Sequence, residues 1–145
     1  MIVADLPLMQ IDLTVGQPIE VAPDRRSIPI TGGVVAGTYT GTVLAGGADW
    51  QQIGSDGTID IDARYVLELA DGRVEVHSRG LRAGPAEVLA RLAKDETVDP
   101  ALYYFRTAMR FCTATPALER LNRVLAISRG ERLAGVVRLT VYEVT

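Results

Sequence analysis

The chain has one cysteine, Cys112, and one histidine, His77, among its 145 residues. A single cysteine excludes an internal disulfide and any cage of cysteine ligands for a metal. A single histidine excludes the usual zinc sites, so we expect no metal. Scarcity of cysteine is typical of proteins from reducing compartments, and we therefore expect a cytoplasmic location.

The sequence also lacks the excess of basic residues that nucleic-acid binding requires. The formal net charge is −3, and 14 of the 15 basic residues are arginines interspersed with Asp and Glu. Without a basic stripe, nucleic acid is not an expected partner. The apolar runs are much shorter than the roughly 18 residues of a membrane span. These short runs lead us to expect no membrane partner. The opening segment MIVADLPLMQIDL lacks the basic region of a signal peptide, and we expect it not to be one.

Glycine turns and strict alternation of apolar and polar residues dominate what is present. In Thr58–Leu69 the apolar side chains fall on one face, namely Ile59, Ile61, Ala63, Tyr65, Leu67 and Leu69. This pattern predicts a half-buried strand. Asp71-Gly72 has the residue types of a tight hairpin turn, and Arg73–Arg79 alternates again as the returning strand.

Similar reasoning predicts further strands. Thr38–Leu44 precedes a Gly-Gly turn, and Val124–Ser128 and Leu133–Val144 flank a predicted turn at 129–131. Near the start, we expect Met9–Val15 to pair with Ile19–Val21 across an intervening glycine.

One segment has a helical pattern instead. Pro85 lies at an expected first helical position, and the apolar residues of AEVLARLAK recur at helical spacing, which predicts a short helix over Pro85–Lys94. Many short strands with one helix indicate an all-β class, an antiparallel barrel or sandwich. The length of 145 residues suits a single domain over residues 1–145.

Several phrases occur together in an order that resembles a known family. They are RRSIPI at 25–30, GGADW at 46–50, DARY at 62–65, YYFRT at 103–107 and Leu121-Asn122. The ordered set resembles the family called domain of unknown function 3237, or UPF0311, and the resemblance covers roughly Leu6 to Val144. The resemblance implies a calycin-like antiparallel β-barrel, a cytosolic setting and frequent dimers, so a homodimer is expected. It implies no assigned activity.

Asp49 and Trp50 directly follow a Gly-Gly turn, which places them at a strand end near a barrel mouth. Small barrels bind ligands in their mouths. Asp49 is therefore a candidate general base whose pKa is raised by an apolar neighbour, and Trp50 a candidate wall. The alternative is an aspartate that accepts backbone hydrogen bonds in a turn, with the tryptophan closing the core.

Arg64 and Tyr65 are adjacent on one strand, so only one of them can face the interior. The alternation buries Tyr65, whereas the family resemblance suggests that Arg64 holds a carboxylate or pairs with Asp49. Tyr104 and Arg106 could supply an aromatic wall and a cation, or belong to an ordinary core strand with its arginine reaching solvent.

Two further residues, Arg26 and Asn122, lie in the shared phrases and are candidate binding residues by resemblance. The Gly32-Gly33 segment lacks the lysine and the following helix of a phosphate-binding loop, so we expect no nucleotide or other cofactor.

Two hypotheses about function follow. The first is a small-molecule-binding β-barrel, which as an enzyme would be a cofactor-free hydrolase, lyase or isomerase that acts on an aromatic or polyketide-like compound. The second is a non-catalytic dimeric binding or scaffold protein. The sequence leaves open whether the protein is an enzyme. Convergence of Asp49 and the arginines on a cavity favours the first hypothesis, whereas their packing together without a cavity favours the second.

Overall fold

Ten strands account for most of the chain in the computed structural model, which describes residues 2–145. They are β1 (Met9–Val15), β2 (Ile19–Ala22), β3 (Arg25–Gly37), β4 (Gly41–Val43), β5 (Gly47–Ile53), β6 (Ile59–Leu69), β7 (Gly72–Ala83), β8 (Tyr104–Cys112), β9 (Leu125–Leu133) and β10 (Val136–Val144). One α-helix, α1 (Ala86–Ala93), and two 3-10 helices, η1 (Pro100–Leu102) and η2 (Pro116–Arg123), complete the described chain.

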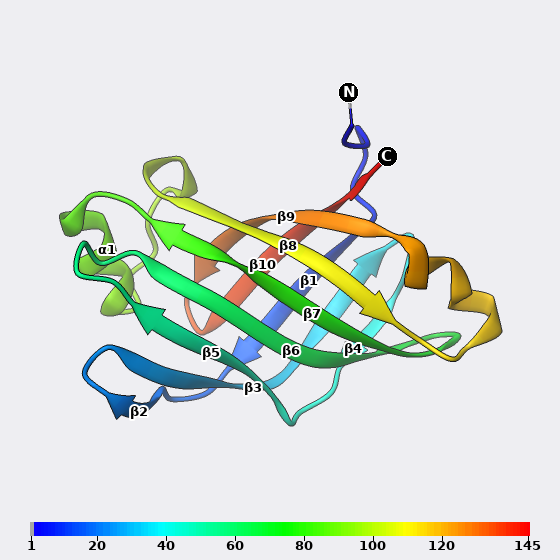
Figure 1. The fold of residues 1–145 in the computed structure, drawn as a ribbon, viewed down its shortest axis with the longest axis horizontal. Coiled ribbons are helices and arrows are strands. Elements are labelled where there is room, and N and C mark those ends of the chain that lie inside the picture. Colours follow the sequence, from blue (N-terminus) through cyan, green and yellow to red (C-terminus); the bar gives the residue numbers. More distant parts are fainter. Residues whose placement is uncertain (1) are drawn as a thin grey trace.

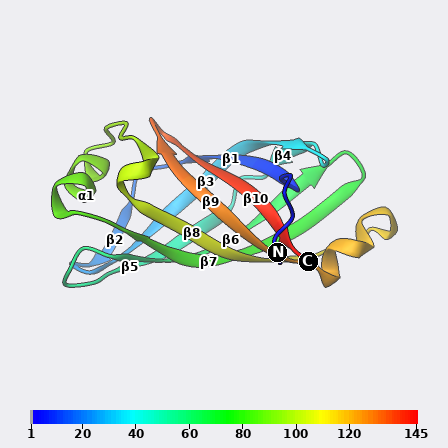
Figure 2. The same ribbon diagram turned by 90° about the horizontal axis from the view of Figure 1, so that it is seen from above.

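The strands close into an antiparallel barrel, as predicted (Figures 1 and 2). Around the barrel, the order is β3, β1, β10, β9, β8, β7 and β6, and the position between β6 and β3 is shared by β4 and β5. The pairing of β1 with both β10 and β3 closes the circle. Closure pairs the strand edges that an open sheet would leave free.

The central hairpin β6–β7 has the predicted alternation. Buried residues of β6 alternate with more exposed ones, so that Tyr65 is 2% exposed and Arg64 lies on the outer face. The turn itself is displaced by one residue from the prediction, because Leu69 pairs with Gly72 and leaves Ala70-Asp71 as the loop. Tyr65, and not Arg64, therefore faces the barrel interior, as the alternation of apolar residues predicts.

One predicted turn and one predicted pairing are wrong. The hairpin between β9 and β10 turns at Ala134-Gly135, where Gly135 has a φ of 66°, and residues 129–131 continue β9. Gly130 is in the middle of this strand because the Phe105 ring packs against it. Near the start, β1 pairs with β10 and β3, while β2 pairs only with β3, so β1 and β2 do not form the predicted hairpin.

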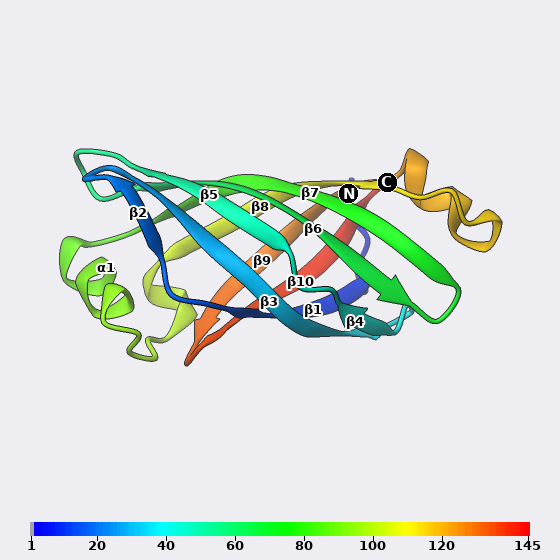
Figure 3. The same cartoon turned by 90° about the horizontal axis from the view of Figure 1, so that it is seen from below.

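The two ends of the barrel differ. At one end α1 packs Val88 and Leu92 inward, and at the other end η2 buries Leu118 and Leu121 (Figures 1 and 3). The helix at 85–94 was predicted, with Pro85 now preceding the first helical residue, whereas η1 and η2 were not predicted. Among residues 2–145, no helix has the length and apolar character needed to cross a membrane.

Gly130 gives a first test of the packing. An added Cβ would lie 2.5 Å from the Phe105 ring, so we expect Gly130→Ala to overpack the barrel at a cost of about 1–3 kcal/mol. The melting temperature would fall by roughly 2–10 °C for a chain of this size. Gly16→Ala is the control, because its new methyl group would meet only ordinary contacts of 3.5 Å or more. Equal melting temperatures for the two variants would contradict this packing.

Candidate functional site

A cavity of about 460 Å³ occupies the barrel at the end covered by α1. Strands from the whole circumference line it, and Leu89, Leu92 and Ala93 of α1 contribute to its wall. Much of the remaining wall is apolar and includes Leu13, Ile28, Ile30, Ile61, Phe105 and Leu139. A partly apolar cavity with a few polar groups is the usual form of a small-molecule site.

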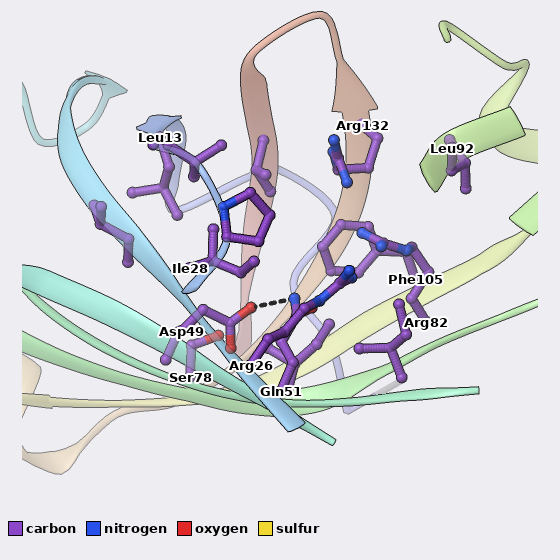
Figure 4. A pocket seen from close by; sticks show the side chains of 18 of the residues that line it. Leu13, Arg26, Ile28, Asp49, Gln51, Ser78, Arg82, Leu92, Phe105 and Arg132 are labelled. Atoms are coloured by element: carbon purple, nitrogen blue, oxygen red, sulfur yellow. Dashed lines mark hydrogen bonds between the residues drawn. The ribbon is translucent and has the colours of Figure 1, made fainter. Parts of the chain in front are cut away.

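Asp49 lies on the inner wall of this cavity (Figure 4). It is the third residue of β5, where it pairs with Ala63 of β6. One carboxylate oxygen, Oδ1, accepts the Asp62 backbone N–H at 3.1 Å, and Oδ2 accepts the Gln51 Nε2 amide at 2.7 Å. The Gln51 Oε1 in turn accepts the Arg26 Nε–H at 2.8 Å. A chain of hydrogen bonds therefore runs from Arg26 through Gln51 to Asp49.

Burial decides the proton affinity of Asp49. Removal from water raises the pKa of the Asp49 carboxyl, although the Gln51 amide, the Asp62 N–H and the nearby Arg82 and Arg26 all act to lower it. The net direction is upward, because the loss of hydration outweighs these favourable contacts. A carboxylate with a raised pKa is a stronger base than an ordinary aspartate.

Three arginines from strands far apart in sequence line the same cavity. Arg26 comes from β3, Arg82 from β7 and Arg132 from β9, and Figure 4 shows Arg82 and Arg132 on the side of the cavity near Phe105. Burial lowers the pKa of Arg82 to about 10, and the charges of Arg132 and Arg26 add to this effect. Burial likewise lowers the pKa of Arg26, with Arg132 contributing. These guanidiniums therefore repel one another within a poorly hydrated space.

The three arginines differ in their partners. Arg132 contacts the Asp95 carboxylate at 3.1 Å, and Arg26 donates to Gln51. Arg82 is 4% exposed, has no ion-pair partner among the described residues, and its Nε has no hydrogen-bond acceptor. Its guanidinium lies 5.7 Å from the Phe105 ring centroid. Arg82 is thus a buried cation without a counter-ion from the described chain.

Two hydroxyl groups on the cavity wall are also without partners. Tyr65 Oη and Ser78 Oγ are buried, and neither forms a hydrogen bond in the described protein. Burial, followed by the charge of Asp49, raises the pKa of the Tyr65 hydroxyl, so this group stays protonated. Unpaired buried hydroxyls are uncommon and call for an explanation.

The sequence-based candidates divide into inner and outer residues. Asp49, Tyr65 and Arg26 line the cavity, whereas Trp50 is 60% exposed and Arg64 is exposed on the outer face. The predicted pairing of Arg64 with Asp49 is wrong. Asp49 pairs with Ala63 and points inward, so the next residue along β6, Arg64, points outward. It contacts His77 Nδ1 there, at 3.5 Å.

The remaining candidates also lie away from the cavity. Tyr104 is 53% exposed, and the Arg106 guanidinium stacks at 5.2 Å from its ring on the outside of β8. Asn122 Oδ1 accepts the Thr113 backbone N–H, and Asn122 Nδ2 donates to the Thr113 carbonyl oxygen. These two hydrogen bonds stabilise the connection between β8 and η2. The predicted wall of Trp50 and Tyr104 is therefore replaced by Phe105, the neighbour of Tyr104 that faces inward.

The polar cavity residues that sequence reasoning missed include Gln51, Ser78, Arg82 and Arg132. A signal existed for two of them, since Ser78 and Arg82 keep the alternation of the buried Val74 and Val76 along β7. Within residues 2–145, no group of three or more His, Cys, Asp or Glu side chains is placed to hold a metal ion.

Comparison with known proteins gives consistent matches. A family model described as "Protein of unknown function (DUF3237)" matches residues 6–144. The UPF0311 protein blr7842 of Bradyrhizobium diazoefficiens is 44% identical over 83% of this chain and 80% of its own length. A crystal structure of a conserved protein of unknown function from Rhodopseudomonas palustris is 36% identical, with a TM-score of 0.94 over 99% of this chain and 97% of that one. A beta-barrel like protein from Acinetobacter baumannii is also 36% identical, with a TM-score of 0.82 over 99% and 96%.

Proposed function

We propose that this chain binds a small organic anion in its barrel cavity and that Asp49 removes a proton from the bound anion and returns it. The chain belongs to the DUF3237 family of proteins of unknown function. The observation that carries the proposal is Arg82, a buried guanidinium without a counter-ion in the described chain. A buried charge is costly unless it is paired. A carboxylate, enolate or phenolate of a ligand would supply the missing partner.

The charges around the cavity support an anionic ligand. Three guanidiniums line it, against the two carboxylates of Asp49 and Asp95. Asp95 is engaged with Arg132, and Asp49 is held by uncharged donors, so neither neutralises Arg82 directly. An anion on Arg82 would form a charge-assisted hydrogen bond in a poorly hydrated site, where such bonds are strong. The apolar wall and Phe105 favour a partly apolar or aromatic body for this ligand.

Asp49 supports a cofactor-free reaction on the bound anion. Its raised pKa suits a general base, and its two hydrogen bonds to the protein fix the carboxylate in one orientation. A hydrolase, a lyase and an isomerase can each use such a base. The non-catalytic alternative rests on the same hydrogen bonds, which are also those of a structural aspartate. A homodimer stays a prediction for either function.

A matched pair of probes tests the proposal. We expect 3-phenylpropanoate to bind in the cavity and its neutral amide, 3-phenylpropanamide, to bind at least ten-fold more weakly. The reason is that a hydrogen bond to a charged group contributes about 1.5–3 kcal/mol, and ten-fold in affinity is about 1.4 kcal/mol. Titration calorimetry at fixed ionic strength measures both constants. Equal affinities, or no binding of the carboxylate, would contradict an anion site.

A further inference from the structure

Asp49, Ser78 and Tyr65 are neighbours of the small residue Ala63 on the inner wall of the barrel. Asp49 and Ser78 are the two cross-strand neighbours of Ala63, on β5 and β7 respectively. Tyr65 is two residues beyond Ala63 on β6 and therefore faces the same side. All four residues line the cavity, and Figure 4 shows Ser78 next to Asp49. Ala63, whose side chain is only a methyl group, therefore has three polar neighbours on the cavity wall.

Neither the Tyr65 hydroxyl nor the Ser78 hydroxyl forms a hydrogen bond within residues 2–145. Tyr65 is 2% exposed and Ser78 is 1% exposed. Both oxygens are shielded from solvent by the folded protein, so much of their desolvation cost belongs to folding and not to ligand binding. Preorganised donors of this kind bind a developing negative charge more strongly than donors that must first shed water.

We propose that Tyr65 Oη and Ser78 Oγ donate hydrogen bonds to a carbonyl oxygen of the substrate, which is therefore a keto acid or a related carbonyl compound bearing an anionic group. The inference rests on the proposed function, because the anion on Arg82 orients the carbonyl toward the two hydroxyls. With the carbonyl oxygen between them, the adjacent carbon lies on the side of Asp49.

The reaction that this arrangement favours is keto–enol isomerisation. The Asp49 carboxylate takes a proton from the carbon next to the carbonyl, and the C–H electron pair forms the C=C bond. The carbonyl π pair moves to oxygen, where the two hydroxyl donors stabilise the enolate. Return of the proton to carbon restores the ketone, and its delivery to oxygen gives the enol. No oxidant, reductant or other co-reactant is needed.

Phenylpyruvate and 3-phenylpropanoate test the inference, because they share the ring and the carboxylate and differ in the keto group. We expect the wild-type protein to bind phenylpyruvate about ten-fold or more tightly, since two hydrogen bonds are added. In the double variant Tyr65→Phe with Ser78→Ala this preference disappears, so that phenylpyruvate and 3-phenylpropanoate bind with similar affinity. Both substitutions remove groups that are unpaired in the fold, so the melting temperature is expected to stay level or rise.

Tyr103→Phe is the matched control, because the Tyr103 hydroxyl accepts the Arg132 backbone N–H at 2.8 Å. It is expected to lower the melting temperature and to keep the preference for the keto acid. If wild-type protein binds both probes equally, or if the double variant keeps the preference, the carbonyl site is wrong and the anion site stands. If neither probe binds, the proposed function fails and the carbonyl site with it.

Discussion

Replacing Arg82 by methionine is expected to weaken the binding of 3-phenylpropanoate by roughly 10–100-fold and to raise the melting temperature. The loss of affinity corresponds to one charge-assisted hydrogen bond, worth about 1.5–3 kcal/mol. The gain in stability arises because Arg82 is 4% exposed and its guanidinium has no ion-pair partner among the described residues. Methionine has a similar reach, fills the same space against Phe105 and carries no charge to desolvate.

We expect the stability gain to be on the order of 1–3 kcal/mol, the usual cost of an unsatisfied buried polar group, or several degrees in melting temperature. Arg106→Met is the control, since Arg106 lies on the outside of β8 and stacks on Tyr104. Calorimetric titration and thermal denaturation of both variants give the two readouts. A destabilised Arg82→Met protein, or loss of affinity in Arg106→Met alone, would place the anion site elsewhere.

The fold followed from the sequence where alternation was long and regular. Strand β6 alternates over eleven residues, which was enough to place Tyr65 inside and Arg64 outside. The β9–β10 turn was misplaced because Gly130 was interpreted as a turn residue. Its absence of a side chain instead accommodates Phe105, a contact between strands that local sequence does not encode.

The cavity was only partly predictable, because its charge comes from residues that closure of the barrel brings together. Arg26, Arg82 and Arg132 belong to β3, β7 and β9, and no local pattern relates them. Arg82 carried the clearest signal, since it keeps the phase of the buried Val74 and Val76. An arginine on the apolar face of a strand is unusual enough to mark a binding residue.

The inner position of Asp49 depended on a strand that the sequence did not reveal. Asp49 was expected at a strand end beside a tryptophan wall, whereas β5 continues through both residues and turns Trp50 to solvent. The choice of Asp49 itself remains a prediction, and its chemistry can be tested directly.

Replacing Asp49 by asparagine is expected to slow the exchange of the phenylpyruvate methylene hydrogens with solvent deuterium by about 10²–10⁴-fold, the usual contribution of a general base. Asparagine keeps the shape of the side chain and can still accept the Asp62 N–H. Proton NMR in deuterated buffer measures the exchange rate above its spontaneous value. Asp62→Asn is the control, because it removes a carboxylate one strand away that pairs with His77 on the outer face. Equal losses in the two variants, or none in Asp49→Asn, would exclude Asp49 as the base.

The pH dependence of the Asp49→Asn variant gives a second, independent readout. Burial raises the pKa of Asp49 in the folded protein above the ordinary aspartate value of about 3.9. The folded state therefore holds this proton more tightly than the unfolded chain. The resulting stabilisation is fully present below the ordinary pKa and is lost as the pH rises through the raised value. Asp49→Asn removes this loss, so its melting temperature relative to wild type is expected to increase from about pH 4 toward neutral pH.

The wild-type exchange rate is expected to rise over the same range as the carboxylate ionises. A relative melting temperature that instead falls with rising pH would mean that the folded protein stabilises the Asp49 charge, and the aspartate would then be a structural residue.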